Sequence, residues 1–151
     1  MSYEITGKLV AKFGFKLNLV AGLISLTASL LLFAFVPTQG AYWLNVLPAS
    51  LLGALGMSLA YIPGTMASMS GAKPEETGLA SGIVNTSYQI GSAIGLAIIA
   101  VIASAVTKSA VTAGVAETEA LNSGFQAAFI SAAVVSAISV FIAVSKIKQP
   151  K

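Results

Sequence analysis

The sequence contains no cysteine, histidine, aspartate or arginine, and each absence removes some chemistry. Thiol nucleophiles, disulfides and histidine-based acid–base catalysis are excluded, and zinc loses its usual ligands. The acids are five glutamates, of which Glu75 with Glu76 and Glu117 with Glu119 form two pairs beside hydrophobic stretches. Such pairs are typical of solvated charges at helix ends. An enzyme is therefore the least expected class, and we expect no cofactor and no metal site.

Charge of either sign is also scarce. Charged residues make up 9% of the 151-residue chain, against roughly 25% in soluble domains. The mean hydropathy is +0.90. A soluble domain of this size needs polar groups over most of its surface, and too few are present. The composition predicts an integral membrane protein whose outer surface meets lipid or protein. The lysines lie beside the hydrophobic stretches and the chain has no arginine, so we do not expect nucleic acid as a partner.

Four stretches free of charge are long enough to cross a hydrocarbon core, which takes about 20 apolar residues. They cover about 17–36, 42–63, 78–106 and 125–144. The predicted fold is all-α, with four antiparallel transmembrane helices in a single domain over 1–151. Asn122 or Ser123 is the expected N-cap of the fourth helix. Glu4 interrupts the basic-then-apolar order of a cleavable signal, so we expect the first span to be retained.

Lysine positions predict the orientation of these spans, because cytoplasmic loops are enriched in positive charge. One group of lysines flanks alternate spans: Lys8, Lys12, Lys16, Lys73, Lys146, Lys148 and Lys151. The opposite loops hold only Lys108, in the expected long loop 107–121. Loops 1–16, 64–77 and 145–151 are therefore expected to be cytoplasmic. The prediction is a multi-pass protein of the cell membrane with both termini inside.

The third span carries a polar stripe in the segment GLASGIVNTSYQIGSAIG, residues 78–95. At about 100° per residue, one helix face holds Gly78, Gly82, Asn85, Gln89 and Ser92. Lipid tails offer amides no hydrogen bond, so this face is expected to meet another helix or a water-filled path. The residues leave helix packing and substrate-path lining both open. Small-residue spacing predicts further helix packing at Gly53, Gly56, Gly91 and Gly95.

This segment resembles the penultimate-helix signature of the fourteen-span drug:proton antiporters of the major facilitator superfamily, close to G-L-A-S-G-x-x-N-T-x-x-Q-x-G-x-x-x-G. The segment GKLVAKFGFK is similar to that family's basic cytoplasmic loop. The residues that carry this second likeness are Gly7, Lys8, Lys12, Gly14 and Lys16. Ala11 stands where the loop motif has an acid, and Tyr88 stands where many relatives have a basic residue.

The resemblance implies the last four helices of such a transporter, part of its C-terminal six-helix half. It also implies export of amphipathic small molecules, by exchange with protons in the complete form. Because alternating access needs two halves, the implied partners are the remaining helices of a transporter or another copy of this chain. Two alternatives stay open: a nontransporting helix-packing protein, and an inactive truncated gene product. A four-span exporter acting as a dimer is disfavoured, because such exporters depend on a membrane-embedded acid and none of the four spans contains one.

Overall fold

The computed structural model describes residues 15–69 and 71–146, and within them every regular element is helical. The long helices are α2 (Phe15–Ala34), α3 (Leu47–Met69), α4 (Thr77–Thr112) and α5 (Glu117–Lys146). A π-helical turn, Tyr42–Val46, leads into α3, and a 3-10 turn, Pro74–Glu76, leads into α4. In this part of the chain four helices are long and apolar enough to cross a membrane. The predicted all-α, four-helix membrane fold is confirmed.

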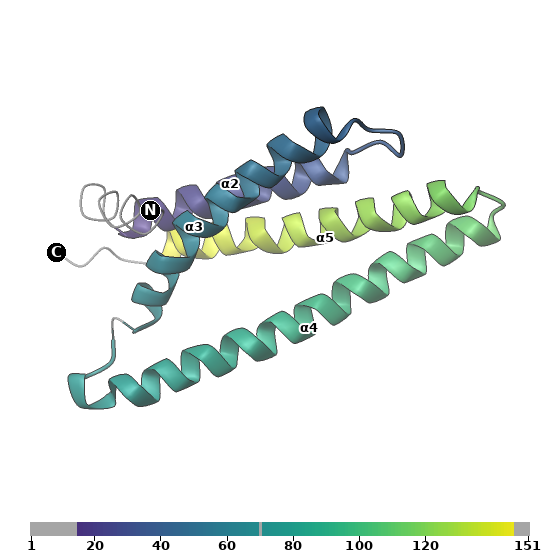
Figure 1. The fold of residues 1–151 in the computed structure, drawn as a ribbon. Coiled ribbons are helices and arrows are strands. Elements are labelled where there is room, and N and C mark those ends of the chain that lie inside the picture. Colours follow the sequence, from purple (N-terminus) through teal and green to yellow (C-terminus); the bar gives the residue numbers. More distant parts are fainter. Residues whose placement is uncertain (1–14, 70, 147–151) are drawn as a thin grey trace.

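The helices run antiparallel, and α4 stands apart from the other three (Figure 1). α2 lies between α3 and α5, while α4 packs mainly on α5 and touches α3 only slightly. Figure 1 shows α4 close to α5 at their connection and further from it toward the α4 N-terminus. None of the residues of α4 is buried. The helix that carries the polar stripe is therefore the least enclosed of the described helices.

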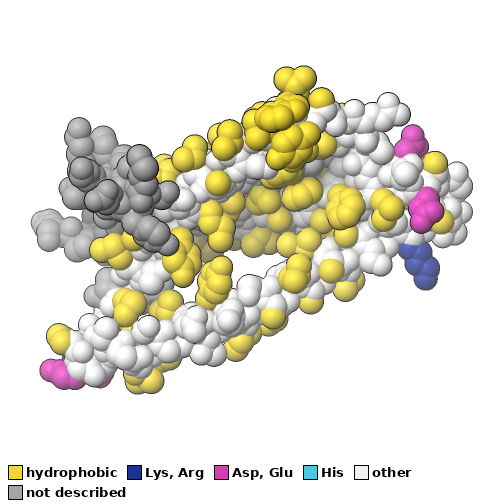
Figure 2. Space-filling model, in the orientation of Figure 1, with side chains coloured by type: hydrophobic (Ala, Val, Ile, Leu, Met, Phe, Trp, Pro, Cys, Tyr) yellow, Lys and Arg dark blue, Asp and Glu magenta, His cyan; other side chains and the backbone are white. Residues whose placement is uncertain are grey.

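Charge on the face drawn in Figure 2 is confined to the two ends of the bundle, and apolar side chains follow the helices between them. Large exposed side chains such as Leu44, Leu96 and Phe141 are more than 70% accessible. Water would disfavour this much exposed apolar surface, whereas lipid tails match it. The surface therefore fits a bilayer along the length of the helices.

The fourth helix begins earlier than expected, so the predicted N-cap at Asn122 or Ser123 is wrong. α5 starts at Glu117, with Glu119 also in its first turn. Glutamates stabilise the positive end of a helix dipole, so the helix extends beyond the apolar stretch used to locate it.

The predicted long loop 107–121 is also wrong, because both α4 and α5 extend beyond their apolar stretches into it. α4 continues to Thr112, and the connection to α5 is residues 113–116. Gly114 has a φ of +84°, and the Val115 N–H donates to the Ala110 carbonyl at 3.1 Å. These are the marks of a Schellman ending, where glycine adopts the left-handed conformation at little cost.

α2 and α3 cross with their backbones in direct contact. A Cβ added to Gly56 would lie 2.7 Å from the Leu26 nitrogen and 2.8 Å from the Gly22 carbonyl oxygen. Two turns away, the Ser29 hydroxyl donates to the Ala49 carbonyl at 2.7 Å. Small residues that admit backbone approach and hydrogen bonding are how membrane helices associate without a hydrophobic effect. Gly53, predicted for packing, also lies here, against Ser29.

α5 covers the other side of α2 through both polar and aromatic contacts. The Thr27 hydroxyl donates to the Ser136 hydroxyl at 2.8 Å, and the rings of Phe33 and Phe129 stack with centroids 5.1 Å apart. The three helices α3, α2 and α5 therefore form a connected layer, to which α4 is attached chiefly through α5.

Candidate functional site: a groove between α3 and α4

The predicted polar stripe lies along α4, with every member exposed. A Cβ on Gly78, Gly82, Gly91 or Gly95 would meet no neighbour within 4 Å. Across residues 15–69 and 71–146, neither the Asn85 nor the Gln89 side-chain amide takes part in a hydrogen bond. Ser92 donates to the Gln89 carbonyl of its own helix at 3.0 Å. Among the described residues, the two amides thus have no hydrogen-bond partner and the four glycines have no close neighbour.

One part of this face lines a groove against α3. The groove encloses about 320 Å³ and brings Ser81, Gly82 and Asn85 of α4 opposite Tyr61 and Thr65 of α3. Its lining combines hydroxyl groups, an amide and aromatic rings, and it contains no carboxylate and no amine. Gly78, Gln89 and Ser92 do not line it. The structure therefore separates the predicted stripe into Gly82 and Asn85, which face the groove, and three residues outside it.

Two tyrosines join the walls of this groove. The rings of Tyr61 on α3 and Tyr88 on α4 meet edge to face, with centroids 6.3 Å apart and planes at 83°. Both also line a second hollow of about 290 Å³, whose other walls are mostly apolar side chains such as Leu23 and Met57, with the hydroxyls of Thr65 and Ser68 among them. The pair therefore lines both a hollow with several polar groups and one that is mostly apolar.

Pro63 helps to explain why this segment of α3 can serve as a wall. Proline donates no backbone hydrogen bond, so the turn around Pro63 lacks one bond of the helical ladder. The helix nevertheless continues to Met69, and Pro63 itself is fully buried. The Thr65 hydroxyl donates back to the Tyr61 carbonyl at 2.9 Å, which supports the turn that holds both groove residues.

Sequence reasoning did not find Tyr61. The second span was expected to end at about residue 63, and no role was assigned to Tyr61 near that end. Because α3 extends to Met69, this side chain lies inside the helix and opposite Tyr88. The sequence offered one signal, a tyrosine within one turn of Pro63. That signal identifies a groove residue only when the helix packed against α3 is known.

The predicted basic loop is described only at its last member. Gly7, Lys8, Lys12 and Gly14 lie outside the described residues. The Lys16 ammonium donates to the Val144 carbonyl at 2.7 Å. A cation at the carbonyl end of a helix is favourable, so Lys16 ties the start of α2 to the end of α5.

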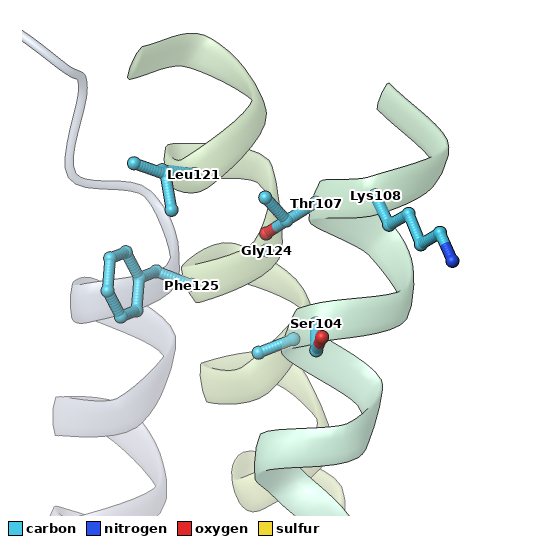
Figure 3. A pocket seen from close by; sticks show the side chains of 7 residues that line it. Ser104, Thr107, Lys108, Leu121, Gly124 and Phe125 are labelled. Atoms are coloured by element: carbon cyan, nitrogen blue, oxygen red, sulfur yellow. The ribbon is translucent and has the colours of Figure 1, made fainter. Parts of the chain in front are cut away.

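A separate hollow of about 370 Å³ lies where α4 and α5 meet, beside their connection (Figure 3). Thr107 points toward Gly124 in this view, and Lys108 points away. A Cβ on Gly124 would lie 2.7 Å from the Ala103 carbonyl oxygen and closer still to the Thr107 hydroxyl. This hollow lies beside a close approach of the two helices at Gly124, rather than at a cluster of groups suited to a ligand.

Comparison with known families gives one match. The model of the family described as the Major Facilitator Superfamily matches residues 5–151. No curated protein and no solved structure matches the chain.

Proposed function

Because the chain belongs to the major facilitator superfamily, a family of transporters, we propose that its α3–α4 groove forms part of a substrate path. The helices place the chain in a lipid bilayer as a multi-pass protein. The proposed finer function is export of amphipathic small molecules, including drugs, by proton antiport in the complete transporter. The chain would supply the last four helices of the C-terminal half.

The observation that carries this proposal is the Asn85 amide in the groove. It lines the hollow opposite α3 and has no hydrogen-bond partner among the described residues. An unsatisfied amide is costly in a bilayer, so such a side chain is retained where water, a ligand or another helix reaches it. A hollow between two helices admits water or a ligand. The helices that complete the path would come from the rest of a transporter or from another copy of the chain.

Proton exchange would use groups outside the four spans. The four helices α2, α3, α4 and α5 themselves contain two side-chain carboxylates, Glu117 and Glu119, both in the first turn of α5 at the end of the bundle. Glu75 and Glu76 lie in the 3-10 turn before α4. Proton relays in membranes use acids or histidines at membrane depth. The proton-carrying group of the complete protein is therefore proposed to lie on another helix.

Replacing Asn85 with leucine tests the groove as a path. We expect transport into or out of vesicles to fall by about tenfold or more, with the protein present in the membrane at its normal level. Removal of a polar group from a path affects passage, whereas Asn85 makes no hydrogen bond among the described residues that the fold would lose. Asn122→Leu makes the same chemical change on α5, outside the groove, and is the matched control. Gln89→Leu tests the part of the stripe outside the groove.

The alternative of a nontransporting helix-packing protein predicts a different result. The exposed glycines and amides of α4 favour it, because they would suit a docked helix. Asn85→Leu would then lower membrane abundance or co-purification of a partner, and the wild type would carry no substrate. An inactive product would show neither effect. The size of the native product on a blot, against the 15.3 kDa of this chain, identifies whether further helices accompany it.

We propose that both termini face the cytoplasm. Figure 1 places the start of α2, the end of α5 and the α3–α4 connection at one end of the bundle, and Lys16 and Lys73 belong to these segments. Lys108 lies at the opposite end, beside the α4–α5 connection. The chain has no cysteine, so single cysteines report without background. We expect an impermeant maleimide to label Thr38→Cys in intact cells, and to label Lys73→Cys only after permeabilisation. The reverse pattern would contradict the orientation.

A further inference from the structure

We propose that Tyr61 and Tyr88 are the ligand-contacting pair of the α3–α4 groove, and that they select planar aromatic molecules that carry no negative charge. This inference rests on the proposed function and names the substrate class for the same groove. It adds two residues, neither of which the polar stripe included. Under this proposal each wall of the groove contributes one ring to the ligand, Tyr61 from α3 and Tyr88 from α4.

The geometry of the pair supports ring recognition. The two rings come from different helices and meet edge to face at 6.3 Å. Aromatic rings prefer offset or edge-to-face partners at centroid distances of about 4.5–7 Å, so a third ring can continue the arrangement. Both tyrosines are about half exposed, at 56% for Tyr61 and 51% for Tyr88. Their faces are therefore accessible from the groove.

The two hollows that the pair lines match a molecule with unlike ends. The polar hollow offers Ser81 and Asn85 to a polar substituent, and the other offers Leu23 and Met57 to an apolar one. The volumes, about 320 and 290 Å³, lie close to the lower end of the range for small-molecule sites, about 300 Å³. A molecule whose ring system lies at the tyrosines can extend into either hollow.

The charge of the groove defines which molecules are excluded. Neither hollow has a lysine, arginine or glutamate in its lining. An anion entering a low-dielectric groove loses hydration and meets no opposite charge. A cation also loses hydration, but the electron-rich faces of two tyrosines attract it. Uncharged and cationic aromatic molecules are therefore accepted, and anionic ones are rejected.

Rhodamine 123 and fluorescein test this selection, because they share one ring system and differ in the sign of their charge. Binding is measured by fluorescence polarisation, with the complete protein as the cell makes it, in lipid nanodiscs. We expect rhodamine 123 to bind at least about tenfold more tightly than fluorescein. Tyr61→Leu and Tyr88→Leu should each weaken rhodamine binding by about tenfold, while Tyr61→Phe, which keeps the ring, should change it by less than about threefold. Equal binding of the two dyes, or no binding of either, would overturn the proposal.

A matched control separates the groove from aromatic residues in general. Tyr42 forms an edge-to-face pair with Trp43 at 5.8 Å, before α3 and away from the groove. Tyr42→Leu should leave rhodamine binding unchanged, and a loss equal to that of Tyr61→Leu would overturn the assignment. A second measurement needs no tyrosine variant. In the Ser81→Cys variant, rhodamine 123 should slow maleimide labelling, whereas labelling of Lys108→Cys should not change; equal rates with and without dye at Ser81→Cys would count against the site.

The outcomes also separate this inference from the proposed function. If Asn85→Leu abolishes transport while Tyr61→Leu binds rhodamine as the wild type does, the path stands and the tyrosine contact is overturned. If the tyrosine variants lose dye binding while Asn85→Leu transports normally, the ring contact stands and the path through the groove is wrong.

Discussion

Substitution of Gly56 by leucine is expected to remove most of the folded protein from the membrane. The Cβ alone would lie 2.7 Å from the Leu26 nitrogen and 2.8 Å from the Gly22 carbonyl oxygen. Both are backbone atoms, which cannot rotate away as a side chain can. α2 and α3 must therefore separate, and the hydrogen bond from Ser25 to the Leu52 carbonyl, 3.0 Å long, would be lost with them. The expected cost is about 3 kcal/mol, the upper end for overpacking, measured as unfolding free energy in mixed micelles.

Gly64→Ala is the matched control within the same helix. A Cβ on Gly64 would make an ordinary contact with a Leu19 methyl group at 3.7 Å. Alanine also favours a helix over glycine by up to about 1 kcal/mol. We expect Gly64→Ala to be neutral or slightly stabilising, while Gly56→Ala is destabilising despite the same gain in propensity. If the two alanine variants were equally stable, the close crossing of α2 and α3 at Gly56 would be wrong.

The fold class could be predicted from the sequence because it depends mainly on hydropathy. A chain with so few charges and four long apolar stretches satisfies its backbone in lipid only as helices or a closed barrel, and these stretches have helical length. Hydropathy predicted the helix ends poorly. Hydropathy falls at Glu117, yet α5 already begins there, because helix hydrogen bonds and the dipole do not depend on apolar side chains.

The candidate site could be predicted only in part, because it depends on which helices are neighbours. Periodicity placed Gly82 and Asn85 on one face of α4, a local property of a single helix. It could not show that Tyr61 stands opposite, since that contact joins residues of two helices through an unknown packing. The division of the stripe has the same origin: Gln89 shares the face with Asn85, but α3 reaches only the Asn85 part.

The helix contacts indicate that three helices form a stable layer and that α4 is the more weakly held wall of the groove. Backbone contacts at Gly22 and Gly56 and the bond from Thr27 to Ser136 hold α3, α2 and α5 together. α4 contributes the other groove wall, and its firm contact is with α5. The position of α4 against α5 therefore controls the width of the groove, and Gly124 is a point of close approach in that contact.

Gly124→Leu is expected to separate α4 from α5 and widen the groove without unfolding the other three helices. A Cβ at this position would lie 2.7 Å from the Ala103 carbonyl oxygen and would overlap the Thr107 hydroxyl. The leucine must push α4 outward, and apart from α5 only slight contact with α3 holds it. Spin labels on Lys108→Cys and Leu121→Cys, which flank this contact (Figure 3), should give a longer and broader distance distribution. Rhodamine 123 binding should weaken by about tenfold, because Tyr88 moves away from Tyr61.

Ala137→Leu adds the same side chain at an exposed position of α5 and is the matched control for bulk. It should leave the spin-label distance and dye binding unchanged. A second pair of labels on α2 and α3, at Ile24→Cys and Leu55→Cys, should keep its distance in Gly124→Leu, because those helices are held by contacts that the substitution does not touch. If this second distance also lengthened, α4 would be an integral part of the helix layer, and the groove would not depend on one movable wall. If neither distance changed, the close contact at Gly124 would be wrong, and with it the control of groove width by the α4–α5 pair.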